Sequence, residues 1–327
     1  MATLKDVAEK AGVTVTTVSR VINNRGYISE QTRTKVYEVM KELSYQPNEL
    51  ARSLSKQKTN TIGIIVPHIV HPYFAKLISN LESMAAKHKF KIILCNTKGE
   101  TEKEKEYIEM CRSNRVSGII LCSRNVDAKE IVNMEIPVVL IERKLEPGTI
   151  GIQCDNYMGG VLATQHLISN GCKNLLHFSG VVNEDMPADA REKAFVDVCQ
   201  KNGVKHYEKQ CNSSVYNHLD YHEYIRKTLK KVPEVDGVFA SSDLIAAQVI
   251  QVCSELGIKI PEQLKLVGFD DVEIAQLTTP TITTIRQPIK EMSEWAIEFI
   301  EKRLEGEAVP EQIKLPVSLV VRESTLY

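Results

Sequence analysis

The spacing of hydrophobic residues near the N-terminus predicts short helices. Apolar side chains recur at positions i, i+3, i+4 and i+7, as Leu4, Val7, Ala8 and Ala11. Gly12 ends this helix because glycine tolerates the left-handed backbone of a tight turn, and Thr14 can cap the next helix. A third helix is predicted from Ser29 to about Leu43. Two short helices joined by a glycine turn indicate a helix-turn-helix.

The second predicted helix has an outer face of short side chains and one guanidinium. Val18, Val21 and Ile22 would face inward, so that the outer face consists of Val15, Thr16, Ser19 and Arg20. Such a face fits a DNA major groove, where arginine can donate two hydrogen bonds to guanine. The alternative, a helical hairpin with a solvated polar face, remains open from this stretch alone.

From Thr61 onward, apolar strand-like runs alternate with helical segments. The predicted strands cover residues 61–66, 91–95, 118–122 and 137–141, and then 174–179, 237–241 and 264–269. The predicted helices cover residues 73–88, 101–113, 127–133, 157–170, 188–202, 219–230 and 244–256, followed by 289–305 and a strand-like tail, 314–321. Nearly continuous apolar runs are typical of strands buried on both faces of a parallel sheet. The two series therefore predict an α/β body of two doubly wound subdomains.

These patterns divide the chain into three parts. Residues 1–46 are the predicted helix-turn-helix domain, and residues 47–60 are a connecting segment, in which 48–54 are expected to form one more short helix before a polar, basic linker. Residues 61–327 are the predicted α/β body. Its first subdomain is expected at about 61–156 and 289–316, and its second at about 157–288 and 317–327.

Composition and charge narrow the class of protein. The net charge of -1 divides into ten basic and six acidic residues over 1–60, and 31 basic and 36 acidic residues over the remainder. A basic module on an acidic body suits local attraction to phosphate. The eight cysteines lack metal-ligand spacing, so we expect buried thiols, no metal and no cofactor. With no signal peptide and no apolar run of roughly 20 residues, the expected location is the cytoplasm.

Several motifs in order along the chain carry a resemblance to a known family. They are LKDVAEKAGVTVTTVSRVIN, YQPNELARSL, TIGIIVP, HPYF (71–74), DNYMGG (155–160), VGFDD (267–271) and TTIRQP (283–288). With them the whole chain resembles the lactose/galactose-repressor (LacI/GalR) family of bacterial transcription regulators. The resemblance implies a dimeric repressor with a periplasmic-binding-protein-like body, palindromic operator DNA as partner, and a small sugar effector bound in the cleft between subdomains.

The same resemblance implies which residues contact DNA. Val15, Thr16 and Arg20 match base-reading positions. The remaining implied DNA-binding residues, near phosphates, beside the reading helix or in the hinge, are Thr14, Thr17, Ser19, Asn23, Ala51 and Leu54. Leu54 matches a leucine that inserts into the minor groove, with Ala51 beside it.

For the effector, polar and aromatic candidates stand at the carboxyl ends of predicted strands, where an open α/β sheet presents ligands. The expected effector-binding residues are Tyr73, Phe74, Glu142, Arg143, Arg191, Ser242, Asp270 and Gln287, with Asp189 and Asp243 as further candidates. Glu142 stands where sugar-binding relatives often have Asp, and Ser242 where they often have Asn. These two departures leave the particular sugar open, and a purine would need more aromatic stacking.

Other classes of protein are less consistent with the sequence. An enzyme is not expected, because no GxxxxGK[ST], GxSxG, HExxH or GxGxxG motif occurs. A sugar-binding protein without DNA function would leave the first sixty residues without a purpose. A global catabolite regulator with a phosphoprotein corepressor stays as an alternative. A dimer is expected rather than a tetramer, because no leucine-heptad helix follows the last strand.

Overall fold

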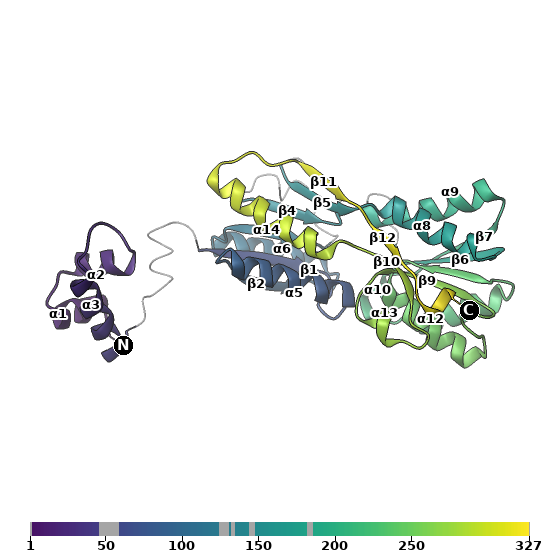
Figure 1. Cartoon of the computed structure of the whole chain (residues 1–327), viewed down its shortest axis with the longest axis horizontal. Helices are drawn as coiled ribbons and strands as arrows, with labels where there is room; N and C mark the ends of the chain where they lie inside the picture. The colour runs from purple at the N-terminus through teal and green to yellow at the C-terminus, as the bar shows by residue number, and fades with distance from the viewer. Residues whose placement is uncertain are drawn as a thin grey trace. The chain divides into compact units, whose positions relative to one another are not determined.

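The computed structural model describes residues 2–45, 59–123, 131, 135–143, 148–181 and 186–326. The chain divides into two compact units, residues 1–59 and 60–327 (Figure 1). Within the described residues, no helix has the length and apolar character needed to cross a membrane.

The first unit is a bundle of three helices, α1 (Leu4–Ala11), α2 (Val15–Ile22) and α3 (Glu30–Glu42). The α1 helix begins with a capping box, in which Asp6 N donates to Thr3 Oγ1 and Thr3 N donates to Asp6 Oδ2. Gly12 follows in the left-handed conformation, at φ 65°. The apolar stripes of the three helices meet in one small core that includes Val7, Val18 and Val36. All three predicted helices are confirmed.

The first lobe of the second unit is built on a fully parallel sheet in the order β11-β5-β4-β3-β1-β2. Its strands are β1 (Thr61–Val66), β2 (Lys91–Asn96), β3 (Gly118–Leu121), β4 (Val138–Ile141), β5 (Ile150–Cys154) and β11 (Gln312–Leu315). Helices α5 (Pro72–Lys87) and α14 (Ile289–Glu305) share one apolar core with the sheet, while α6 (Thr101–Ser113) packs into a second core.

The second lobe has a sheet in the order β12-β10-β9-β8-β6-β7, in which only β12 runs antiparallel. Its strands are β6 (Asn174–Ser179), β7 (Lys205–Gln210), β8 (Gly237–Ala240), β9 (Lys265–Asp270), β10 (Thr283–Arg286) and β12 (Ser318–Val320). Its helices are α8 (Asn156–Ser169), α9 (Ala190–Asn202), α10 (Ser213–His218), α11 (His222–Lys231), α12 (Asp243–Leu256) and α13 (Ile274–Leu277). Short 3-10 turns occur at Pro187–Asp189 and Glu323–Thr325. Two doubly wound lobes are thus confirmed.

The chain passes between the lobes three times, after β5, after β10 and after β11 (Figure 1). The strand-like tail expected over 314–321 forms two strands, β11 in the first sheet and β12 in the second. Pro316 lies between them, and proline has no N–H to continue a ladder. Each of the two strands is so short that the hydrophobic pattern alone does not separate one from the other.

The sequence pattern did not predict some of the helices and strands, because their sequences are polar or short. The edge strand β7 reads KHYEKQ, and one face of an edge strand meets solvent. The helix predicted from residue 219 begins at His222, since Leu219 adopts φ 57° at the end of α10. The helix predicted over 127–133 lies mostly outside the described residues.

Candidate functional site

The helix expected to read DNA presents an exposed face in the first unit. Val15, Thr16 and Arg20 are exposed on α2. Thr14 caps the helix, because its Oγ1 accepts a hydrogen bond from Thr17 N at 3.1 Å. The Asn23 amide donates to Ser19 O at 2.8 Å and holds the end of the helix. Ala51 and Leu54 lie outside the described residues.

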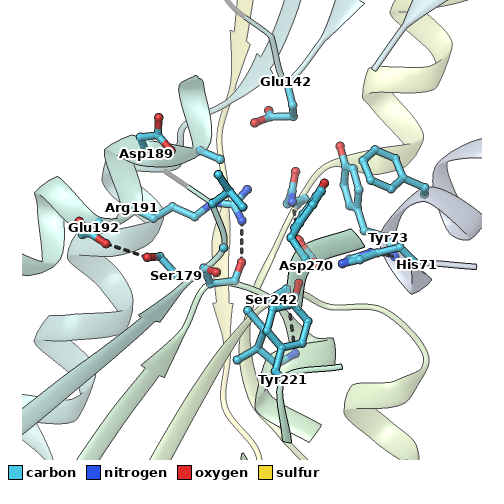
Figure 2. Close-up of a pocket in the computed structure, with 18 of the residues that line it drawn as sticks. His71, Tyr73, Glu142, Ser179, Asp189, Arg191, Glu192, Tyr221, Ser242 and Asp270 are labelled. Carbon is cyan, nitrogen blue, oxygen red and sulfur yellow. Dashed lines mark hydrogen bonds between the residues drawn. The ribbon is translucent and has the colours of Figure 1, made fainter. Parts of the chain in front are cut away.

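A cavity lies between the two lobes of the second unit, at the carboxyl ends of their parallel strands. Its lining includes Tyr73 and Phe74 from the start of α5 and Glu142 after β4. From the second lobe come Asp189, Arg191, Ser242 and Asp270, and Gln287 follows β10. Figure 2 shows Glu142, Tyr73, Arg191, Ser242 and Asp270 around the same cavity. The fold therefore brings together most of the residues expected at the effector site.

Arg191 is held in place by three contacts. Its Nε donates to Asn156 Oδ1 at 2.7 Å, its Nη1 donates to Ser241 O at 2.7 Å, and the guanidinium carbon lies 3.6 Å from the centre of the Phe269 ring. Stacking on an aromatic face suits the planar guanidinium. Arg191 is thus a preorganised donor at the cavity wall.

Glu142 is tied to the same network from the first lobe. Its Oε1 accepts from Cys154 N at 2.6 Å, and its Oε2 accepts from Asn156 Nδ2 at 2.7 Å. Asn156 therefore links Glu142 to Arg191. The sequence reasoning missed Asn156 as a site residue, although it lies in the DNYMGG motif.

Asp270 lines the cavity and is almost entirely buried in its wall. Its Oδ1 accepts from Gln287 Nε2 at 2.6 Å. Burial raises the pKa of Asp270 to about 7, although the nearby Arg191 acts in the opposite direction. Asp270 has φ 116°, and Glu142 has φ 53°. Positive φ values are costly for residues other than glycine and gather at functional sites.

Arg143, which was expected at the effector site, and Asp243, a further candidate, have other surroundings. Arg143 does not line the cavity: its Nη1 lies 3.0 Å from Glu104 Oε1 and also donates to Ser123 O, with the two charged side chains 6% and 0% exposed. It is turned toward α6 because a buried guanidinium needs a carboxylate partner. Asp243 is buried as well, where it accepts from Val272 N at 2.9 Å and from Thr284 Oγ1 at 2.5 Å.

The cavity also contains residues that the sequence reasoning did not select. They include His71, His177, Ser179, Glu192, Tyr216 and Tyr221. His71 caps α5, where its Nδ1 accepts from Tyr73 N at 3.2 Å. Ser179 ends β6, so its position relative to the strand was a usable signal. His177 lies inside an apolar strand, where no local pattern distinguishes a ligand contact from a core residue.

Within the described part of the chain, no cluster of three or more His, Cys, Asp or Glu side chains suits a metal ion. All eight cysteines are buried free thiols. Burial raises the pKa of Cys253 to about 12, which keeps that thiol protonated at neutral pH.

Sequence comparison identifies two known domains. Residues 3–48 match the profile of bacterial regulatory proteins of the lacI family, and residues 164–325 match a periplasmic binding protein-like domain. The chain is 36% identical to the sucrose operon repressor of Streptococcus mutans over 324 residues, which is 99% of each chain. It is 33% identical to the ribose operon repressor of Halalkalibacterium halodurans, over 99% of this chain and 97% of that protein.

A solved structure supports the same assignment. A periplasmic binding protein/LacI transcriptional regulator from Alkaliphilus metalliredigens, in complex with D-xylulofuranose, matches with a TM-score of 0.74 and 34% identity over 82% of this chain and all of that one. Together with the full-length relatives, this match shows that the chain belongs to the lacI family of bacterial regulatory proteins.

Proposed function

We propose that this chain is a homodimeric repressor of a carbohydrate-utilisation operon, and that a small sugar in the cavity between the lobes controls its affinity for the operator. The observation that carries the proposal is the convergence of aromatic, acidic and arginine side chains from both lobes on one cavity. The names of its relatives, repressors of sucrose and ribose operons, and the D-xylulofuranose complex support a carbohydrate effector.

The cavity has the chemistry that binds a polyol. Tyr73 and Phe74 supply an aromatic wall for the apolar face of a sugar ring. Arg191 is fixed by Asn156 and Ser241, so that its remaining donors can meet hydroxyl oxygens without further ordering. Carboxylate and amide oxygens of the cavity accept hydrogen bonds from the hydroxyl groups of the sugar. The expected effector contacts are Tyr73, Phe74, Glu142, Arg191, Ser242, Asp270 and Gln287.

The first unit supplies recognition of DNA. Arg20 is proposed to donate two hydrogen bonds to a guanine, beside Val15 and Thr16 in the major groove. Contacts from Thr14, Thr17, Ser19 and Asn23 orient the helix without reading sequence. Residues 47–60 are proposed as the hinge, with Ala51 and Leu54 at the minor groove. Two reading heads related by a dyad read the two halves of a palindrome.

As a regulator, the protein is proposed to return its ligand chemically unchanged and to work in the cytoplasm, where its operator is. Residues 1–46 are the proposed DNA-binding domain, and residues 61–327 are the proposed effector-binding and dimerisation domain. Recovery of each sugar unaltered after long incubation with purified protein is the expected result, and turnover of any of them would contradict it.

The proposal is tested on an operator selected from random duplexes by the full-length protein. Fluorescence anisotropy then measures operator affinity with D-ribose, D-fructose, sucrose or cellobiose present. A palindromic consensus and a change of at least about tenfold with one sugar are expected. Selection of no palindrome, or the same affinity with every sugar, would contradict the proposal.

Two variants that each remove one cation separate base reading from general attraction to phosphate. Arg20→Ala should lose about tenfold or more in operator affinity, whereas Lys41→Ala on α3 should lose much less. Equal losses for the two variants would assign Arg20 to non-specific attraction.

A further inference from the structure

His177 places an unusual hydrogen-bond acceptor in the cavity wall. It lies within β6 with 0% exposure, and its Nδ1 is 2.9 Å from Phe239 O. A carbonyl oxygen only accepts, so Nδ1 carries the proton and Nε2 has a lone pair. Among the described residues, Nε2 has no hydrogen-bond partner.

Gln287 adds a second acceptor of the same kind. Its Nε2 donates to Asp270 Oδ1, which fixes the orientation of the amide and leaves Oε1 as an acceptor. Within the described part of the chain, neither Gln287 Oε1 nor Asp270 Oδ2 has a partner, although both are buried. Tyr73, whose hydroxyl is likewise unpartnered there, can donate to only one of these atoms.

The neutral state of His177 is stable. Burial lowers the pKa of His177 to about 3, with Arg191 adding to the effect. Nε2 therefore remains an acceptor at physiological pH. A buried acceptor without a donor is costly, so a ligand that donates hydrogen bonds gains affinity by satisfying it.

The charge of the cavity also favours a ligand that donates hydrogen bonds and carries no phosphate. Four acidic side chains line its described part, on Glu142, Asp189, Glu192 and Asp270, against a single guanidinium, and burial disfavours ionisation of Asp270 strongly enough to raise its pKa to about 7. Two of the donor nitrogens of Arg191 are already engaged. A phosphate group would add like charge and would bring almost no hydrogen-bond donors, whereas each hydroxyl of a sugar brings one.

We propose that the effector is an unphosphorylated polyol, one hydroxyl of which donates a hydrogen bond to His177 Nε2, so that His177 is a specificity-determining residue of the cavity. This inference rests on the proposed function, because it describes the ligand of the same site. It adds a contact from the interior of β6 to those expected at strand ends, and it excludes sugar phosphates.

The competing explanation is that His177 only packs. Its ring centre lies 4.6 Å from that of Phe239 and 5.3 Å from that of Phe195, so apolar neighbours surround it. Leucine would satisfy a packing role, because it is apolar and of similar size. His177→Leu therefore separates the two roles.

The first experiment uses wild-type protein and titration calorimetry with D-ribose, D-fructose and sucrose, each beside its monophosphate. The best neutral sugar should bind at least about tenfold more tightly than its phosphate. Tighter binding of a phosphate that also shifts operator affinity overturns this inference and leaves the proposed function intact. If no compound binds or shifts operator affinity, the proposed function falls, and this inference with it.

The second experiment compares His177→Leu with His206→Leu. His206 lies on the neighbouring strand β7 and contacts Phe195 from a position outside the cavity lining, which makes it a matched control. His177→Leu should weaken binding of the preferred sugar about tenfold or more, and His206→Leu should leave it unchanged. Unchanged affinity in His177→Leu overturns the contact.

Monodeoxy analogues of the preferred sugar identify the hydroxyl. Wild-type protein should bind one of the analogues more weakly than the parent sugar, by about the same factor as the His177→Leu substitution weakens binding of the parent sugar. In His177→Leu, removal of the same hydroxyl should weaken binding little further. The wild-type series keeps the inference testable if His177→Leu fails to fold. Equal binding of every deoxy analogue by wild type would overturn the inference.

Discussion

Arg191 lies at the centre of the hydrogen-bond network in the cavity wall. It joins Asn156, Ser241 and the Phe269 ring, and through Asn156 it is connected to Glu142 of the other lobe. The arrangement presents several fixed donors on one plane. Lysine has neither the planar shape nor the stacking of this group.

We expect Arg191→Ala to abolish the response of operator binding to the sugar while operator affinity without sugar stays nearly unchanged. Lys193→Ala, which removes an exposed cation from the same helix, is the matched control and should respond like wild type. Titration of operator-bound protein with sugar measures both. If Arg191→Ala and wild type respond at the same sugar concentration, Arg191 is not part of the site.

Two adjacent aspartates at the end of β9 have opposite electrostatic surroundings. Burial raises the pKa of Asp270 to about 7. Burial by itself would raise the pKa of Asp271 too, but hydrogen bonds from Arg322 and Arg286, at 2.5 and 2.6 Å, hold it below its usual value. The same sheet edge therefore disfavours one negative charge and stabilises the next.

The raised pKa of Asp270 and the lowered pKa of Asp271 change the free energy of unfolding in opposite directions. Ionised Asp270 destabilises the fold, and this cost develops as pH rises from about 4, the unfolded value, to about 7. Asp270→Asn should thus gain stability over wild type across that interval. Asp271→Asn should lose stability, most of all above about pH 4, where the unfolded carboxyl is also ionised. Urea unfolding from pH 4 to 8 measures both, and parallel curves for wild type and Asp270→Asn would contradict the first expectation.

The buried pair of Arg143 and Glu104 gives a prediction for stability rather than for binding. Glu104→Gln leaves a guanidinium buried without its carboxylate, which should cost about 3 kcal/mol or more of unfolding free energy. Glu102→Gln, in an exposed pair with Lys105 on the same helix, should cost under about 1 kcal/mol. Urea unfolding at pH 7 compares the two. Similar losses of unfolding free energy in the two variants would show that Glu104 does not stabilise the buried charge of Arg143.

At the scale of elements, glycines let α8 pack closely on its neighbours. A Cβ atom at Gly160 would lie 2.6 Å from Arg191 O and 2.8 Å from Ala194 Cβ, both on α9. At Gly159 it would lie 2.6 Å from Cε2 of Phe269, the ring on which Arg191 stacks. The close approach of α8 and α9 thus positions the arginine of the cavity.

Gly160→Ala tests this packing against intrinsic helix preference. In a helix interior, alanine is more favourable than glycine by about 1 kcal/mol. Here the clash with the α9 backbone should reverse the sign, with a net loss of about 1–3 kcal/mol and weaker sugar binding. Gln165→Ala, on the exposed side of α8, should change neither property. Thermal unfolding measures the stability of the variants, and calorimetry measures their sugar binding. Increased stability of Gly160→Ala would contradict the packing argument.

At the scale of the second unit, further contacts join the two lobes. Lys76 Nζ of α5 donates to Asp271 O at 2.9 Å and lies 3.5 Å from Glu273 Oε1, and the His68 and Tyr216 rings meet edge to face at 5.4 Å. A ligand that contacts both lobes favours their closed arrangement only by its difference in affinity for the closed and open forms.

Coupling between sugar and operator should therefore be reciprocal. If saturating sugar changes operator affinity by a given factor, saturating operator must change sugar affinity by the same factor. Calorimetric titration of sugar into free and operator-bound protein measures this, and sedimentation should show a dimer in both states. Unequal factors would indicate a further species in the equilibrium, and a monomer bound to the whole palindrome would contradict the proposed dimer.

Local patterns in the sequence determined most of the elements. Apolar spacing, caps and Gly12 were sufficient for the three N-terminal helices, and short apolar runs were sufficient for strands such as Thr61–Val66 and Asn174–Ser179, because periodicity and capping act over a few residues. The resemblance to known regulators, which rests on ordered motifs, indicated the family.

Tertiary structure alone decided what those patterns could not express. It paired β12 antiparallel with β10, turned Arg143 toward Glu104, and brought His177 into the cavity wall. Each depends on strand order and on partners distant in the sequence: Glu104 is 39 residues from Arg143, and Phe239 is 62 residues from His177. A buried polar side chain is given its role by the atoms that it meets, and those atoms come together only when the sheets form.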